Sequence, residues 1–154
     1  MRALVVRICV LLIGGAVPAA AEVEPALSAE VGSPLKLSAN LGIRVARAAE
    51  EDEADYGRGF LIQAQPGLGG IALNVGWVPV ALPAWGTQAV GFAVKARYLR
   101  SWGDPWGGLE PDQDYLGGEV VLAWIVKVSA GVLTRVGSGS GKRTIFTWSI
   151  GVGI

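Results

Sequence analysis

The chain has 154 residues, with 13 basic and 13 acidic side chains and no histidine. Without histidine, catalytic Ser-His-Asp and Cys-His arrangements and histidine-ligated zinc sites are excluded. Its 23 glycines in 154 residues are about twice the roughly 7% of ordinary proteins, and because glycine is unfavourable inside helices, this composition favours an all-β chain.

Residues 1–21 have the three-part pattern of a cleaved signal peptide. Arg2 and Arg7 form a basic start, residues 8–17 are apolar, and three alanines precede Glu22. The apolar run is shorter than the ~20 residues that a spanning helix needs. We therefore expect an exported protein whose single domain covers residues 22–154.

Cleavage would change the charge and the chemistry of the domain. Removing Arg2 and Arg7 from the 13 basic residues leaves 11 against 13 acidic ones, a balance that does not favour nucleic-acid binding. Cys9, the only cysteine, would also be lost, so disulfides and thiol chemistry are not expected.

Period-two alternation of apolar and polar side chains predicts a series of strands. A short one is predicted at Glu22–Val31, where Pro25 suggests an edge segment and leaves this eighth strand the weakest. The cleanest alternation runs from Leu35 to Arg47. The other predicted strands cover residues 60–65, 71–81, 88–102, 115–126, 128–135 and 144–154.

Two features set limits on this interpretation. Residues 59–94 carry no charge, which could indicate spanning helices, but Pro66, Pro79 and Pro83 interrupt any helical register there. If the last strand ends on the periplasmic side, the long connection over residues 48–57 lies on that side too, where outer-membrane barrels usually have short turns.

The last strand, TIFTWSIGVGI from Thr144 to Ile154, separates its two faces most clearly. Large apolar side chains such as Phe146, Trp148 and Ile150 alternate with small ones such as Ser149. The strand resembles the closing strand of small bacterial outer-membrane β-barrels, although that family usually ends in an aromatic residue. The resemblance implies an antiparallel up-and-down β-barrel of about eight strands, in contact with membrane lipid and with the outer-membrane assembly machinery.

Charged residues on the small and polar faces of the strands would point into such a barrel, because facing lipid would cost about 2 to 4 kcal/mol for each Lys or Arg at the midplane. The candidate lumen charge cluster consists of Lys36, Lys95, Arg97, Glu119 and Arg135. Arg44 lies on the same face of its predicted strand. The cluster is interpreted as a packed plug in which Glu119 pairs with one or two cations, and an anion-attracting interior is the alternative.

These patterns predict a structural or surface-interaction role in the cell envelope, with the outer membrane as location. We expect no enzyme activity, no cofactor, no metal site and no catalytic residues, and no protein partner is indicated. A soluble β-barrel in the periplasm or outside the cell, binding a small apolar ligand as lipocalins do, remains the alternative.

Overall fold

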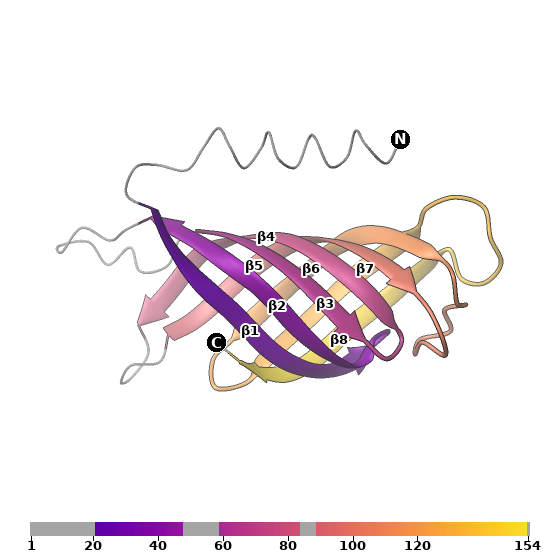
Figure 1. Ribbon diagram of the computed structural model, residues 1–154, viewed down its shortest axis with the longest axis horizontal. Coiled ribbons are helices and arrows are strands. Elements are labelled where there is room, and N and C mark those ends of the chain that lie inside the picture. The colour runs from indigo at the N-terminus through magenta and orange to yellow at the C-terminus, as the bar shows by residue number, and fades with distance from the viewer. Residues whose placement is uncertain (1–20, 48–58, 84–88, 154) are drawn as a thin grey trace.

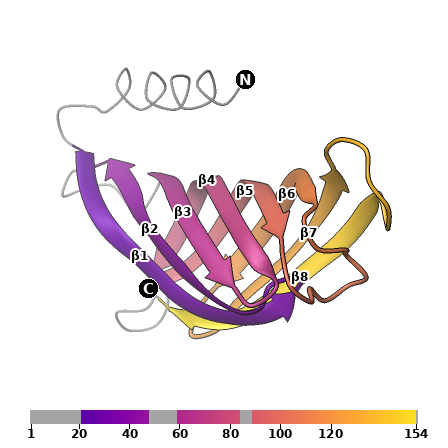
Figure 2. The same ribbon diagram turned by 45° about the vertical axis from the view of Figure 1, so that its right-hand side comes forward.

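The computed structural model describes residues 21–47, 59–83 and 89–153, which form one closed antiparallel β-barrel (Figure 1). Its strands are β1 Ala21–Ser33, β2 Lys36–Arg47, β3 Gly59–Gly67, β4 Gly70–Pro83, β5 Ala89–Ser101, β6 Asp114–Ala123, β7 Lys127–Arg135 and β8 Thr144–Gly153. Each strand pairs with its neighbours in sequence, and β1 pairs with β8 to close the barrel, as Figure 2 shows. The predicted all-β up-and-down barrel is confirmed. None of the described residues forms a helix that is long and apolar enough to cross a membrane.

The first strand differs from its prediction. The short edge segment is in fact a 13-residue strand, β1, which pairs with β2 from Ala21 to Gly32 and with β8 from Ser28 to Ser33. Pro25 lies before the stretch that pairs with β8, so its missing N–H removes nothing from that seam. The predicted signal peptide lies outside the described residues, except for Ala21, which begins β1.

The reversal between β6 and β7 also differs from its prediction. The sixth strand ends at Ala123 and not at Val126. Residues 124–126 form a tight turn in which the Trp124 N–H donates to the Val126 carbonyl at 3.1 Å. The difference arises because the turn is apolar and contains no Gly, Pro, Asn or Asp that would mark a reversal in the sequence.

The two ends of the barrel differ in their connections. The terminal end carries Ala21 of β1, Gly153 of β8 and the β6–β7 turn. The opposite loop end has two-residue turns between β1 and β2 and between β3 and β4, and longer loops over residues 102–113 and 136–143. Strand β2 ends and β3 begins at the terminal end, so the expected conflict over the connection 48–57 persists, although that segment lies outside the described residues.

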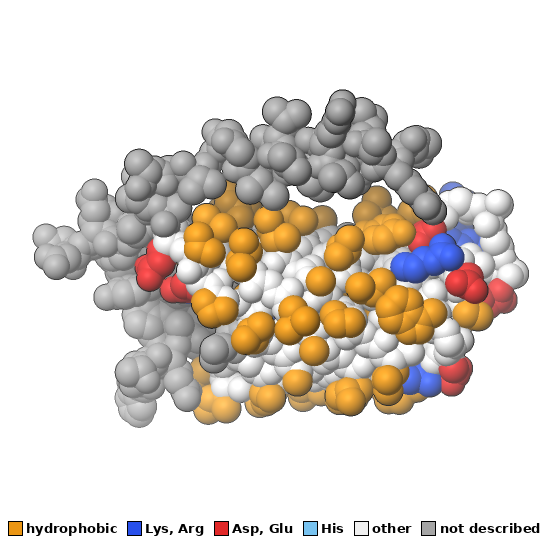
Figure 3. All heavy atoms as spheres, in the orientation of Figure 1, with side chains coloured by type: hydrophobic (Ala, Val, Ile, Leu, Met, Phe, Trp, Pro, Cys, Tyr) orange, Lys and Arg blue, Asp and Glu red, His pale blue; other side chains and the backbone are white. Residues whose placement is uncertain are grey.

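Polar and apolar side chains are distributed inside out. Among the described residues, 14 polar or charged side chains are buried against 13 apolar ones. All eight strands expose large apolar side chains, including Phe60, Leu73 and Ile150, which are 62%, 52% and 50% exposed. Figure 3 shows these side chains along the wall of the barrel, with the charged residues gathered at its two ends. Because polar side chains of water-soluble domains are mostly exposed, this arrangement suits an apolar surrounding medium.

The loop end of the lumen is filled by an apolar plug, defined as the buried cluster Leu35, Ala72, Leu99, Leu109, Tyr115, Leu133 and Ile145. Leu109 belongs to the long β5–β6 loop, which therefore folds back over the opening. Ser101 holds the base of this loop, since its hydroxyl donates to the Glu110 carbonyl at 2.7 Å. Among the described residues, the plug therefore packs the lumen at the loop end.

Candidate binding site in the barrel lumen

The middle of the lumen contains a network of hydrogen bonds around Glu30. This carboxylate is 2% exposed and forms an ion pair with Lys127. It also accepts four hydrogen bonds, from Asn40 Nδ2 at 2.6 Å, Ser149 Oγ at 2.7 Å, and Gln65 Nε2 and Ser28 Oγ at 3.1 Å each. A buried charge with this many partners is well compensated, so Glu30 joins β1, β2, β3, β7 and β8 as a structural centre.

A second buried group lies on β5 and β6. The register places Lys95 directly opposite Glu119, and Arg97 follows two residues later on the same face of β5. Arg97 Nη1 donates to Glu119 Oε2, while Lys95 Nζ lies 3.5 Å from Oε1 of the same carboxylate. All three side chains are at most 3% exposed. One carboxylate is thus paired with two cations, and it is hydrogen-bonded to the arginine but not to the lysine.

The other two members of the predicted lumen cluster lie at the loop end. Lys36 has a positive φ of 64° beside the β1–β2 turn, and its ammonium pairs with Asp104 of the β5–β6 loop at 2.7 Å. The Arg135 guanidinium donates to the carbonyls of Ser140 and Gly141 in the β7–β8 loop. The structure therefore brings together Lys95, Arg97 and Glu119, and it does not bring Lys36 or Arg135 to them.

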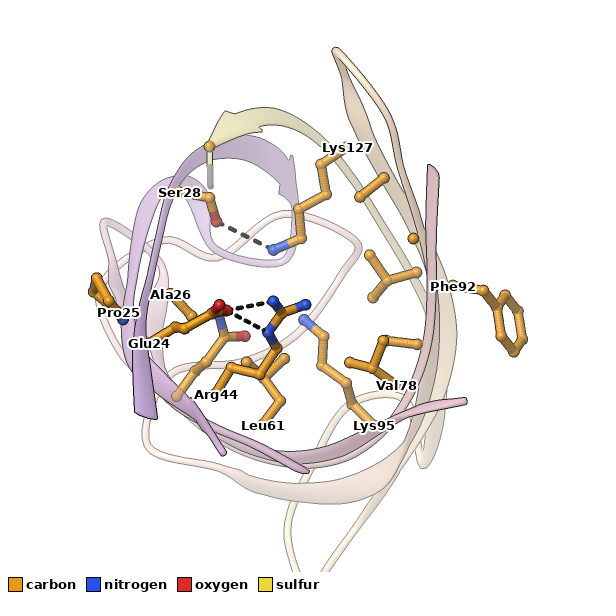
Figure 4. Close-up of a pocket in the computed structure, with 16 residues that line it drawn as sticks. Glu24, Pro25, Ala26, Ser28, Arg44, Leu61, Val78, Phe92, Lys95 and Lys127 are labelled. Atoms are coloured by element: carbon orange, nitrogen blue, oxygen red, sulfur yellow. Dashed lines mark hydrogen bonds and ion pairs between the residues drawn. The ribbon is translucent and has the colours of Figure 1, made fainter. Parts of the chain in front are cut away.

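A cavity of about 480 Å³ occupies the half of the lumen near the terminal end (Figure 4). Its wall is largely apolar, with Leu61, Val78, Ala93 and Val121 among the lining residues. In Figure 4 the Arg44, Lys95 and Lys127 side chains converge on this space, whereas Phe92 points away from it.

The cations around the cavity differ in how well they are partnered. Arg44 Nε donates at 2.8 Å to Oε2 of Glu24, its register partner on β1. Lys127 pairs with Glu30 and donates to Ser28 Oγ at 3.1 Å. Lys95 Nζ, by contrast, has no hydrogen-bond partner among the described residues. The cavity is thus lined by three cations and one carboxylate, Glu24, and one of the cations is buried without a hydrogen bond.

The contact between Ser28 and Lys127 could suggest a nucleophile and its base. However, the Ser28 hydroxyl donates to Glu30 and the Lys127 ammonium pairs with that same carboxylate. Both groups line the cavity, but their polar atoms are engaged by the Glu30 carboxylate, so they do not act on each other as a nucleophile and its base. Within the described ranges, no three Asp, Glu, His or Cys side chains cluster in a way that could hold a metal ion.

Sequence reasoning missed Glu24, Glu30 and Lys127 as lumen residues. The acidic residues share a face with Ser28 in the alternation of residues 22–31, but because Pro25 predicts only a short edge segment there, this face was not assigned to the lumen. Lys127 has the same parity as Ser129, so extending the alternation of β7 by one step would have found it.

Comparisons of the chain with protein-family models, with curated proteins and with solved structures give no match.

Proposed function

We propose that this protein is an outer-membrane β-barrel with a structural or surface-interaction role in the cell envelope. The observation that carries the proposal is the inverted distribution of side chains around the closed barrel, with exposed large apolar residues on all eight strands and buried charges inside. A closed barrel leaves no unpaired strand edge, which is the condition for strands to span a bilayer.

The lengths of the strands support the same proposal. They contain 9 to 14 residues, close to the ~9–11 residues of a tilted transmembrane strand with short extensions. Three of the five exposed tryptophans among the described residues lie toward the ends, Trp102 and Trp106 at the loop end and Trp124 at the terminal end, whereas Trp77 and Trp148 lie within β4 and β8. Amphipathic indole rings at two levels are typical of the headgroup regions of a membrane.

A non-catalytic role is part of the proposal. It is supported by the Glu30 carboxylate, which receives both the Ser28 hydroxyl and the Lys127 ammonium. Export and contact with the outer-membrane assembly machinery follow from the same proposal, because bacterial barrels of this kind reach their membrane through them.

Membrane extraction of the full-length protein expressed in a Gram-negative host tests the location. We expect it to stay in the membrane pellet after carbonate and urea washes, and to run at different positions on gels with and without heating. Release into the soluble fraction as a monomer without detergent would favour the soluble lipocalin-like barrel instead.

A further inference from the structure

The cavity of about 480 Å³ lies on the side of the apolar plug that faces the terminal end of the barrel. The apolar plug fills the lumen at the loop end, where Leu99, Tyr115 and Leu133 are fully buried. The charged layer that contains Lys95 and Glu119 lies between this plug and the cavity. The volume of the cavity falls within the range of about 300 to 1,000 Å³ that is usual for small-molecule sites. Eight-stranded barrels, by contrast, often have interiors filled by their own side chains.

The wall of the cavity combines two chemistries. Val78, Ala93 and Val121 form a separate buried apolar cluster on β4, β5 and β6, and Leu61 of β3 extends it. Lys95 projects from the same strand as Ala93, two residues further on the inner face. An apolar patch therefore lies beside an ammonium group.

The ammonium of Lys95 is the feature of the cavity wall that favours an anionic ligand. Its side chain is 1% exposed, and its nitrogen has no hydrogen-bond partner among the residues that the structure describes. The nearest carboxylate, that of Glu119, lies 3.5 Å from the Lys95 nitrogen and is hydrogen-bonded to Arg97 instead. The ammonium is paired with Glu119 but not hydrogen-bonded, and a buried ammonium is costly unless it is both. An acceptor in the cavity would supply the missing hydrogen bond once the flexible Lys95 side chain turns its nitrogen toward the cavity that it lines.

We propose that the cavity binds a small organic anion, a carboxylate with a short apolar chain, whose carboxylate accepts hydrogen bonds from Lys95 and whose chain packs against Val78, Ala93 and Val121. A bare inorganic ion would leave this apolar wall in contact with water, and a neutral apolar molecule would leave Lys95 without an acceptor. The site goes beyond the proposed membrane location, because it depends only on the interior of the barrel, whereas the titration below, with the barrel held in lipid, rests on that location.

Calorimetric titration of the refolded barrel tests the proposal. The barrel is held in nanodiscs of zwitterionic lipid, so that the added probe supplies the only ligand carboxylate. The probes are octanoate, acetate and octanol, with empty nanodiscs as the blank for partitioning. We expect saturable binding of one octanoate per barrel, and at least about tenfold weaker binding of acetate and of octanol, since each lacks one of the two interactions.

Two variants and one control locate the site. Lys95→Met keeps the unbranched side chain as far as Cε, removes only the ammonium and leaves Glu119 paired with Arg97. It should weaken octanoate binding at least about tenfold, as expected for loss of a hydrogen bond to a charged group. Lys36→Met removes a cation at the loop end and should leave binding unchanged. Ala93→Leu fills part of the apolar wall and should weaken octanoate binding more than acetate binding, which keeps the proposal testable if Lys95→Met does not fold.

Three results would overturn the proposal. Octanoate binding that is equal in Lys95→Met and wild type would place the probe elsewhere, acetate binding as tight as octanoate would indicate a simple anion site, and titrations equal to the blank would mean that the cavity holds no such ligand.

Discussion

Glu119 is the counter-charge of two cations buried inside the barrel. Lys95 and Arg97 lie on the same inward face of β5, at most 3% exposed, and both contact this carboxylate. Their register partners on β6 are Glu119 and Gly117, so the strand opposite supplies one charge and one small residue.

Replacing this carboxylate by a neutral amide, Glu119→Gln, should therefore destabilise the barrel. Two buried cations would lose their counter-charge, and breaking a buried ion pair by removing one partner costs about 3 to 5 kcal/mol. The free energy of unfolding, measured by urea titration of the barrel in lipid vesicles, should fall by an amount in this range.

Asp112→Asn is the matched control for this change. Asp112 also pairs with an arginine, Arg100, but their side chains are 83% and 41% exposed. An exposed ion pair contributes about 0 to 1 kcal/mol, and asparagine tolerates the positive φ of 59° at this position. Equal effects of the two changes would mean that Glu119 is solvated in the folded barrel.

Strand β6 shows how closely neighbouring strands approach on the inner side of a small barrel. Adjacent glycines, Gly117 and Gly118, face opposite sides of the wall. A Cβ on Gly117 would lie 2.0 Å from the Val132 carbonyl oxygen, whereas one on Gly118 would have the Lys95 carbonyl oxygen as its nearest neighbour, at 3.6 Å. Glycine at 117 is thus required by the approach of β7, and glycine at 118 is not.

Gly117→Ala should consequently cost about 1 to 3 kcal/mol, the usual penalty for overpacking a tight interior. Gly118→Ala should change the stability by less than about 0.5 kcal/mol, as surface substitutions usually do. Neither glycine has a positive φ, so alanine fits both backbones and the difference isolates the close approach. Urea unfolding midpoints of the two variants give the comparison, and a larger loss at position 118 would contradict the assignment of the two faces.

Strand β1 closes the barrel through only six residue pairs with β8, from Ser28–Gly153 to Ser33–Trp148. Side chains strengthen this seam, because Ser149 of β8 donates to Glu30 of β1 at 2.7 Å. The Glu30 network is therefore also the means by which the first and last strands are held together inside the lumen.

Substitutions on the outer surface can test whether lipid or water surrounds the barrel. Val132, near the middle of β7, and Val136, just beyond its end, are almost equally exposed, at 51% and 55%. In water, an arginine at either position would be solvated and the two substitutions would have similar small effects.

In a bilayer the same substitutions should differ. Val132→Arg should cost about 2 to 4 kcal/mol near the midplane, and Val136→Arg about 0 to 1 kcal/mol near the interface. Urea unfolding in lipid vesicles measures both values, and equal values would contradict the proposed membrane location.

The pattern of side chains along the chain was enough to predict the fold class, an all-β barrel. Alternation is a local property, set by the period of a strand, so the two faces of residues 35–47 or 144–154 can be recognised without knowledge of the fold. The barrel was predicted for this reason, and so was the inward direction of Lys95, Arg97 and Glu119.

The side-chain contacts and the cavity inside the barrel could not be predicted from alternation, because they depend on how the sheet closes. Ser149 and Glu30 are 119 residues apart in the sequence, and Lys127 and Ser28 are 99 apart, yet they meet because β1 pairs with β8. The loop end of the lumen is filled because the β5–β6 loop brings in Leu109. Lys95 has no hydrogen bond because the Glu119 carboxylate, which lies near both cations, is hydrogen-bonded to Arg97. Faces follow from local periodicity, whereas contacts across a lumen follow from the register and the closure of the whole sheet.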